Sequence, residues 1–100
     1  MIRVKPSAPF SRTDFARYLD SKKIGNRMLF GGNLLRQPAF VQLRKDWPNA
    51  LRVVGNFAGA DELMHNAVFL GTYPGLTAGM LEYEVQTIHD YVKKMSGKLL

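Results

Sequence analysis

The chain contains no cysteine in its 100 residues. It therefore cannot build a disulfide, a thiolate metal site, an iron–sulfur centre or a cysteine nucleophile from its own side chains. No apolar run approaches the roughly 20 residues that span a bilayer, and the opening residues MIRVKPSAPF lack the apolar stretch of a signal peptide. Together these absences predict a cytoplasmic protein that has no membrane partner.

The common catalytic and phosphate-binding motifs are also missing, namely the P-loop, G-x-G-x-x-G and G-x-S-x-G. There are two histidines, and no cluster of His, Asp and Glu has metal-ligand spacing. We expect His89 on the surface of the last helix, whereas His65, just before a strand, is a candidate to face a ligand. The chain alone is predicted to hold no catalytic residue, no cofactor and no metal.

The net charge is +6, but the basic residues are scattered along the sequence. No nucleic-acid-binding motif accompanies them, so we expect a solvated basic surface and no nucleic-acid partner. The positive charge also suits an acidic ligand such as a sugar nucleotide. A free-standing basic binding module is an alternative interpretation of the same composition.

Hydrophobic periodicity predicts one small domain over residues 1–100. The expected elements are strands at 1–5, 24–30 and 67–73, and helices at 11–22, 61–66 and 77–97. The order β-α-β-loop-(short α)-β-α indicates a two-layer α/β sandwich of the α+β class. The strand–helix–strand unit is expected to form a right-handed parallel crossover, with the third strand antiparallel to the first two.

Capping signals mark the helix starts. Ser11 is a good N-cap, Asp14 follows at capping-box spacing, and Phe10 can pack on Phe15 as a hydrophobic staple. Asp61 is expected to cap the short helix, and Thr77 the last one. Apolar residues at helical spacing give the last helix one apolar face, formed by Leu81, Val85, Ile88, Val92 and Met95.

The segment MLFGGNLLRQPAF, residues 28–40, is too apolar for a solvent linker and too rich in glycine and proline for a helix. It opens a stretch from 31 to 60 that has little periodicity, apart from a turn or two of helix near 40–46. A connection of that length in a small domain is usually functional or disordered. Its apolar content predicts that it packs on another surface.

Polar groups are embedded in that apolar segment. The run Gly31-Gly32-Asn33 is suited to a sharp turn that presents backbone N–H groups to an anion, although turn formation alone also explains it. Arg36 offers a planar fork for a carboxylate or a phosphate, and Gln37 offers an amide. Polar groups in apolar surroundings usually meet a partner.

Three strings, IGNRMLFGGNLLRQPAF, RVVG and DELMHNAVFLGTYPGLT, resemble the carboxyl-terminal part of the DegT-type sugar aminotransferase family. Within that family they are most similar to the branch of CDP-4-keto-6-deoxy-glucose 3-dehydrases. The resemblance covers residues 2–92 and implies the small C-terminal domain of fold-type I pyridoxal-phosphate enzymes. It implies a parent enzyme of deoxysugar and lipopolysaccharide O-antigen biosynthesis. A nucleotide-sugar aminotransferase of the same fold is the alternative.

The resemblance further implies what such a parent would contain. It would use pyridoxamine or pyridoxal phosphate to remove the C3 hydroxyl of a nucleotide-linked 4-keto-6-deoxy sugar. The cofactor site, the proton-transfer residue and any iron–sulfur cysteines would belong to a large domain that precedes this segment. That large domain would also form most of a homodimer interface. The chain would then be a fragment that is inert alone and exposes surface the large domain covers.

Carried over residue by residue, the resemblance implies a substrate-binding wall. Its members are Gly31, Gly32, Asn33, Arg36 and Gln37, with Asn33 and Arg36 as polar contacts, and His65 is the further candidate. The chain departs from the branch at Asn56, Glu62, His65 and Phe69, where Asp, a basic residue, Asn and Trp are frequent. The departure at Glu62 reverses a charge. That reversal changes the charge offered to an anionic substrate.

Overall fold

The three strands form one sheet in which the last strand lies in the middle. The computed structural model describes residues 1–97. Strands β1 (Ile2–Arg3) and β2 (Asn26–Met28) both pair antiparallel with β3 (Ala67–Leu70), in the order β1-β3-β2. This confirms the predicted direction of the third strand. Strands β1 and β2 run in the same direction, but β3 separates them, so they share no ladder of hydrogen bonds.

All three strands are shorter than the sequence predicted. The expected strand at 1–5 is regular only over Ile2–Arg3, and the one at 67–73 ends at Leu70. Pro6 and Gly71 follow soon after these ends, and neither residue type supports a ladder. The backbone N–H of Val4 still donates to the carbonyl of Asn66 at 2.8 Å, which extends the pairing beyond β1.

Helix α1 (Arg12–Ser21) begins as the sequence predicted. Ser11 Oγ accepts a hydrogen bond from the backbone N–H of Asp14 at 3.1 Å, which confirms the N-cap. The ring centroids of Phe10 and Phe15 lie 5.9 Å apart, which confirms the staple. These two local contacts fix the direction in which the chain enters α1.

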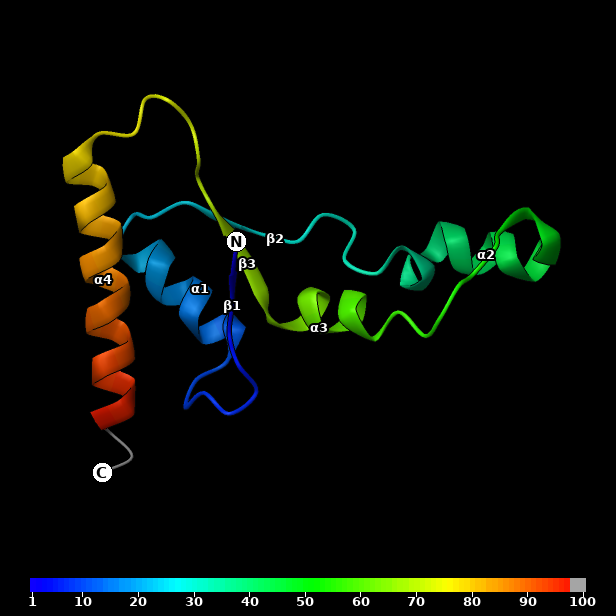
Figure 1. Ribbon diagram of the computed structural model, residues 1–100, viewed down its shortest axis with the longest axis horizontal. Helices are drawn as coiled ribbons and strands as arrows, with labels where there is room; N and C mark the ends of the chain where they lie inside the picture. The colour runs from blue at the N-terminus through cyan, green and yellow to red at the C-terminus, as the bar shows by residue number, and fades with distance from the viewer. Residues whose placement is uncertain (98–100) are drawn as a thin grey trace.

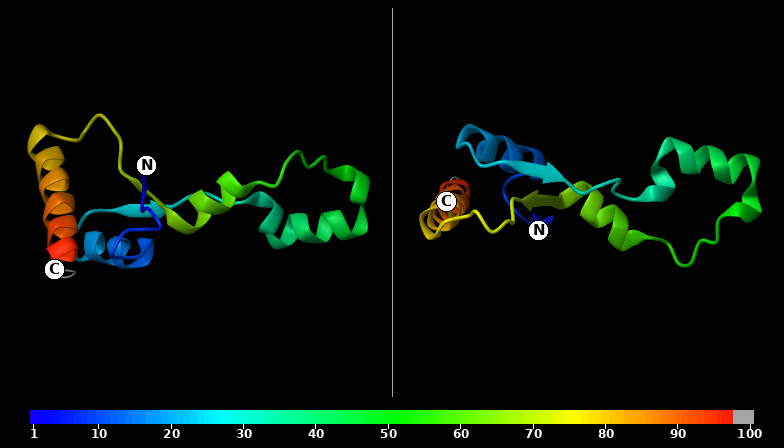
Figure 2. Two further views of the ribbon diagram at one scale, coloured as in Figure 1. Left: turned by 60° about the horizontal axis from the view of Figure 1, so that its bottom comes forward. Right: turned by 90° about the horizontal axis from the view of Figure 1, so that it is seen from above.

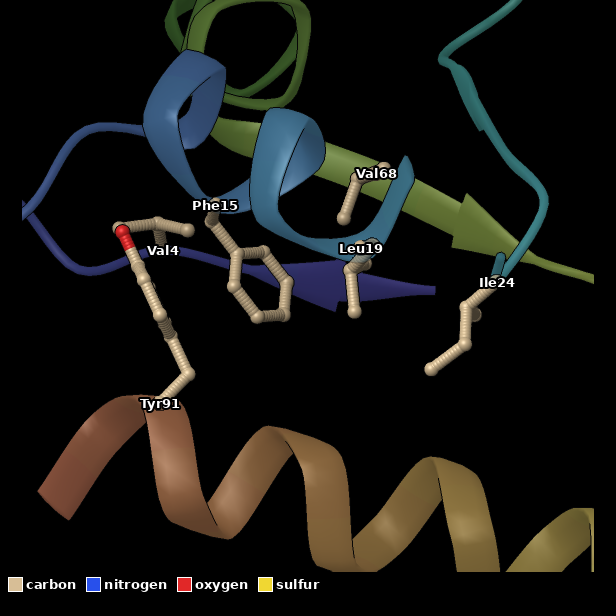
Figure 3. Close-up of a cluster of buried hydrophobic side chains, with 6 residues drawn as sticks. All are labelled: Val4, Phe15, Leu19, Ile24, Val68 and Tyr91. Atoms are coloured by element: carbon tan, nitrogen blue, oxygen red, sulfur yellow. The ribbon is translucent and has the colours of Figure 1, made fainter. Parts of the chain in front are cut away.

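The core lies where α1 and the strands face helix α4 (Ala78–Gly97), as Figure 3 shows. Its buried side chains come from β1, α1, β3, α4 and the segments next to them: Val4, Phe15, Leu19, Ile24, Val68 and Tyr91. The Tyr91 ring stacks on Tyr18 at 4.5 Å between centroids. This aromatic contact joins α4 to α1.

The side of α4 that faces the core differs from the predicted apolar stripe. Within the described part of the helix, the buried residues are Thr87 and Tyr91. Ile88 and Met95 pack at the margin of the core, whereas three stripe residues are exposed, namely Leu81, Val85 and Val92. The prediction of one buried stripe was therefore wrong. An aromatic ring buries more area than a valine, so contacts of Tyr91 with the aromatic rings of α1 and of the segment before it set the rotation of the helix.

Residues 29–57 leave the sheet as a protruding segment, which we call the arm (Figures 1 and 2). It contains helix α2 (Pro38–Asp46), flanked by single 3-10 turns at Leu34–Arg36 and Pro48–Ala50. The molecule measures 50 × 39 × 21 Å along its principal axes, with a radius of gyration of 17.4 Å. A compact domain of this length has a radius of about 13 Å. The arm accounts for the elongation.

The arm folds back on itself and does not cover the core. Phe30 is 93% exposed, and several other large apolar side chains of the arm are also exposed: Leu34, Val41, Trp47, Val53, Val54 and Phe57. The prediction that this stretch packs on another surface is therefore not met within residues 1–97. Exposed apolar patches of this kind usually mark an interaction surface.

Among residues 1–97, no helix is both long and apolar enough to cross a membrane.

Candidate functional site

A tight turn begins the arm where the sequence has two glycines. Gly31 and Gly32 have φ angles of 63° and 58°, which lie in the left-handed region that favours glycine. The side-chain amide of Gln37 donates to the carbonyl of Gly31 at 2.7 Å and closes the turn from the other side. A side chain at Gly32 would meet Met64 of helix α3 (Ala58–Asn66), since a Cβ built there lies 2.4 Å from Met64 Cγ.

The turn does not present its backbone N–H groups to an anion. The N–H of Gly32 donates to the carbonyl of Leu29 at 3.2 Å, and the N–H of Asn33 meets the sulfur of Met64 at 3.5 Å. Both donors are therefore engaged within the chain. These two donors do not serve the suggested anion-binding loop, and the turn-forming role of the glycines is the one that the structure supports.

Asn33 anchors the segment that follows the turn. Its side chain is buried, with 4% of the residue exposed. Its Oδ1 accepts from the backbone N–H of Leu35 at 3.1 Å, which caps the 3-10 turn, and its Nδ2 donates to Asp61 Oδ1 at 3.0 Å. A buried amide needs such partners to offset its desolvation. Asn33 thus links the start of the arm to helix α3 (Ala58–Asn66).

Arg36 and Asp61 form a bidentate ion pair across the same boundary. Arg36 Nε donates to Asp61 Oδ1 at 2.5 Å, and Arg36 Nη2 donates to Asp61 Oδ2 at 2.7 Å. The Arg36 side chain is 60% exposed and that of Asp61 is 24% exposed. Side-on pairing of this type adds directional specificity to the electrostatic attraction. We call Gly31, Gly32, Asn33, Arg36, Gln37 and Asp61 the arm-base cluster.

Asp61 does not cap α3 as the sequence suggested. The helix begins at Ala58, and Asn56 Oδ1 accepts from the backbone N–H of Ala58 at 3.1 Å. Asp61 lies in the first turn instead, where its negative charge suits the helix dipole. The cap prediction was wrong because the carboxylate is bound by Arg36 and Asn33, which come from a distant part of the sequence.

The arm-base cluster shifts the pKa of both members of its ion pair. Hydrogen bonds from Arg36 and then from Asn33 hold the pKa of the Asp61 carboxyl well below its usual range. The hydrogen bond and the charge of Asp61 raise the pKa of Arg36. Both groups therefore stay charged at neutral pH, and their pairing persists through moderately acidic conditions.

We expect Asp61→Asn to reduce the free energy of unfolding at neutral pH, and this difference should shrink in acid. Because folding lowers the pKa of Asp61, the carboxylate stabilises the fold fully above its unfolded pKa of about 4. That contribution is lost as the pH falls through the lower folded pKa. Urea unfolding followed by circular dichroism, at several pH values from about 7 down to 3, measures the change. A difference that stays constant below pH ~4 would contradict the assignment.

An apolar hollow adjoins the arm-base cluster. Its volume is about 340 Å³, and its lining combines cluster residues with apolar side chains of the arm and α3: Gly32, Asn33, Leu34, Leu35, Phe40, Leu51, Phe57 and Ala60. Arg36, whose side chain is exposed, directly follows the lining residues Leu34 and Leu35 in the sequence, so the site combines a charged group with an apolar surface formed by its neighbours. That combination suits a ligand that has one anionic part and one weakly polar part.

His65 does not join the other predicted site residues. It is exposed, and it lines a separate hollow formed with residues 4–14.

Glu62, the charge reversal noted above, pairs with Arg3 of β1 at 3.2 Å. Its carboxylate thus contacts the sheet edge. His89 is exposed, as predicted. The described residues contain no group of three or more His, Cys, Asp or Glu that could hold a metal ion.

Asp61 is the member of the cluster that sequence reasoning missed. A signal was present, because Asp46, Asp61 and Glu62 are the acidic residues between positions 21 and 81. An arginine embedded in an apolar segment requires a carboxylate or a ligand to meet its charge. The choice among the three needed the tertiary structure, which brings α3 to the start of the arm.

No protein-family model matches the sequence. The lipopolysaccharide biosynthesis protein RfbH of Salmonella typhimurium is 37% identical over 90 residues, which make up 90% of this chain. The dTDP-4-dehydro-2,6-dideoxy-D-glucose 3-dehydratase of Saccharopolyspora spinosa is 36% identical over 95 residues, or 95% of this chain. The chain is a relative of both proteins. It spans 19% of the length of each. The resemblance to the 3-dehydrase branch is thereby confirmed.

Proposed function

We propose that this chain is the substrate-cleft domain of a nucleotide-sugar 3-dehydratase in deoxysugar or lipopolysaccharide biosynthesis. The observation that carries the proposal is the match of nine-tenths or more of the chain to two proteins whose names state those roles. The short share of each relative that is covered supports a domain of a longer enzyme. On this proposal the domain binds substrate and supplies no reacting group.

The arm-base cluster supports the binding role. Arg36 carries a charge at the surface, Asn33 and Asp61 hold it in place, and an apolar hollow lies beside them. A nucleotide-linked deoxysugar has matching parts, namely a diphosphate and a sugar with few hydroxyl groups. Guanidinium groups bind phosphate through paired hydrogen bonds. We assign Arg36 to the anionic part of the substrate and the hollow to its less polar part.

The described residues do not by themselves fit a pyridoxamine or pyridoxal phosphate site. Every lysine among residues 1–97 is exposed. The partly buried carboxylate of Asp61, which could otherwise face a pyridinium nitrogen, already binds Arg36 and Asn33. When bound in a parent enzyme, the cofactor would supply the electron sink for loss of the C3 hydroxyl. On our proposal it is held by polypeptide outside this chain, and a homodimer would form there too.

A chimeric enzyme tests the proposal. The segment of the Saccharopolyspora spinosa 3-dehydratase that matches this chain is replaced by residues 1–97, and loss of the C3 hydroxyl is followed by mass spectrometry. Both the dTDP-linked substrate of that enzyme and a CDP-linked 4-keto-6-deoxy sugar are offered. We expect turnover of at least one of them. A chimera that folds and binds cofactor like its parent, yet turns over neither substrate, would refute the proposal.

In the active chimera, Arg36→Ala is expected to raise the KM for the nucleotide sugar. Hydrogen bonds to a charged group contribute about 1.5–3 kcal/mol, which corresponds to an increase of roughly 10- to 150-fold. Arg52→Ala is the matched control, because Arg52 is an exposed arginine of the same arm outside the cluster. Steady-state kinetics on both variants give the answer. Equal KM values for the two would remove Arg36 from the binding site.

A further inference from the structure

Arg36 has one edge that the chain does not use. A guanidinium carries five N–H donors. Its side edge, Nε and Nη2, is bound to the two oxygens of Asp61. Within residues 1–97 no hydrogen bond leaves Nη1, and the side chain is 60% exposed. The end of the guanidinium, formed by Nη1 and the second hydrogen of Nη2, therefore remains available to a ligand.

Asp61, which binds the side edge of the Arg36 guanidinium, is itself hydrogen-bonded by a more buried residue. Asn33, which is 4% exposed, donates to Asp61 Oδ1 at 3.0 Å while its own Oδ1 is bound by the N–H of Leu35. Exposure then rises from Asn33 through Asp61 to Arg36. This order is what a support for an exposed donor requires, because each group is fixed by one that is more buried.

We propose that Asp61 is a positioning residue for anion binding by Arg36. By fixing the side edge of the guanidinium, it presents the end edge as a preset fork for two phosphate oxygens. The inference rests on the proposed function, for which the anion is the diphosphate of a nucleotide-linked sugar. Asp61 itself touches no substrate and acts through Arg36.

Two physical effects of Asp61 oppose each other, and their balance makes the proposal testable. Its negative charge weakens the attraction of an incoming phosphate, so its removal alone would tighten anion binding. Its two hydrogen bonds restrict an arginine side chain that otherwise samples many rotamers, so its removal makes ordering costly at the moment of binding. The proposal states that the second effect is the larger.

The first experiment uses this chain and sodium pyrophosphate. The Nε–Hε resonance of Arg36 is followed by NMR during the titration, and the dissociation constant is compared between wild type and Asp61→Asn. We expect binding to weaken by about fivefold in the variant, because the cost of ordering Arg36 returns. Asp61→Glu, which keeps the carboxylate, should recover most of the affinity. Equal or tighter binding by Asp61→Asn would overturn the proposal.

The control is Asp46→Asn, which removes one negative charge from the arm without touching Arg36. Asp46 accepts a hydrogen bond from Gln42 at 2.8 Å within α2. Pyrophosphate should bind this variant at least as tightly as wild type, since only repulsion is lost. Weakening equal to that of Asp61→Asn would overturn a specific role for Asp61. Thermal unfolding identifies any variant that fails to fold. If Asp61→Asn is one, the NMR order parameter of the Arg36 Nε–H bond in wild type decides, and a value as low as that of the exposed Arg52 would overturn the proposal.

The second experiment separates this inference from the proposed function. In the chimeric dehydratase, Asp61→Asn should raise KM by about fivefold and change kcat less than KM, because Arg36 binds a part of the substrate that does not react. An active chimera whose KM is unchanged by Asp61→Asn overturns the inference and leaves the function standing. An inactive chimera together with the expected pyrophosphate result overturns the proposed function and leaves the positioning role of Asp61 standing.

Discussion

Replacing Phe15 by alanine is expected to bring this protein to the edge of unfolding. Phe15 is 2% exposed, and its ring lies 5.9 Å from that of Phe10 and 5.6 Å from that of Tyr91, centroid to centroid. Truncation of a buried phenylalanine costs about 3–5 kcal/mol. Small domains have a total stability of about 5–15 kcal/mol. With so much of the chain in the exposed arm, we expect the lower end of that range and hence a variant at the edge of unfolding.

Urea and thermal unfolding, followed by circular dichroism, measure this effect. Phe30→Ala is the matched control, because the same side chain is lost from a position that is 93% exposed. That variant should stay within about 0.5 kcal/mol of wild type. If Phe15→Ala also lost less than about 1 kcal/mol, the described core would not be the one that holds the fold together.

Gly32→Ala is expected to cause the second-largest loss in the free energy of unfolding, although Gly32 lies outside the main core. Its φ angle is 58°, and a Cβ there would meet Met64 Cγ at 2.4 Å and Met64 Cβ at 3.0 Å. The left-handed conformation costs a non-glycine residue about 1–2 kcal/mol, and overpacking adds about 1–3 kcal/mol. Rotation of the Met64 side chain can move Cγ, but Met64 Cβ is fixed to the backbone of α3, so relief of that contact requires a shift of the helix or the turn.

Gly59→Ala provides the contrast. Gly59 lies within α3, and a Cβ there has no neighbour within 4 Å. Alanine in place of glycine inside a helix stabilises by about 0.5–1 kcal/mol. The two substitutions should therefore change the free energy of unfolding in opposite directions. A neutral Gly32→Ala would mean that the turn and α3 separate easily, and that the cluster is not a rigid unit.

Local signals in the sequence predicted the regular elements of this protein well. The start of α1 followed from Ser11 and from the pair Phe10 and Phe15, which lie within a few residues of one another. Alternation in the first residues placed Val4 inside and Lys5 outside, as observed. Such features depend on neighbours along the chain, and those neighbours are fixed by the sequence itself.

The rotation of α4 and the partner of Arg36 depended on distant contacts. Spacing alone could not show that Tyr91 would outweigh the aliphatic stripe, because the rings it meets lie on α1 and on the segment that precedes it. Nor could it choose Asp61 for Arg36, which is 25 positions away in the sequence. Contacts of this kind exist only after the elements have packed.

The sequence by itself determined the order of the strands and helices, the turn at the two glycines and the relationship to the 3-dehydrase branch. Only the tertiary structure decided that the glycine turn, Asn33 and Arg36 close on Asp61, and that His65 faces elsewhere. The physical reason is that turns and caps are satisfied by adjacent backbone, whereas a buried amide and a charged pair need partners that folding brings from afar.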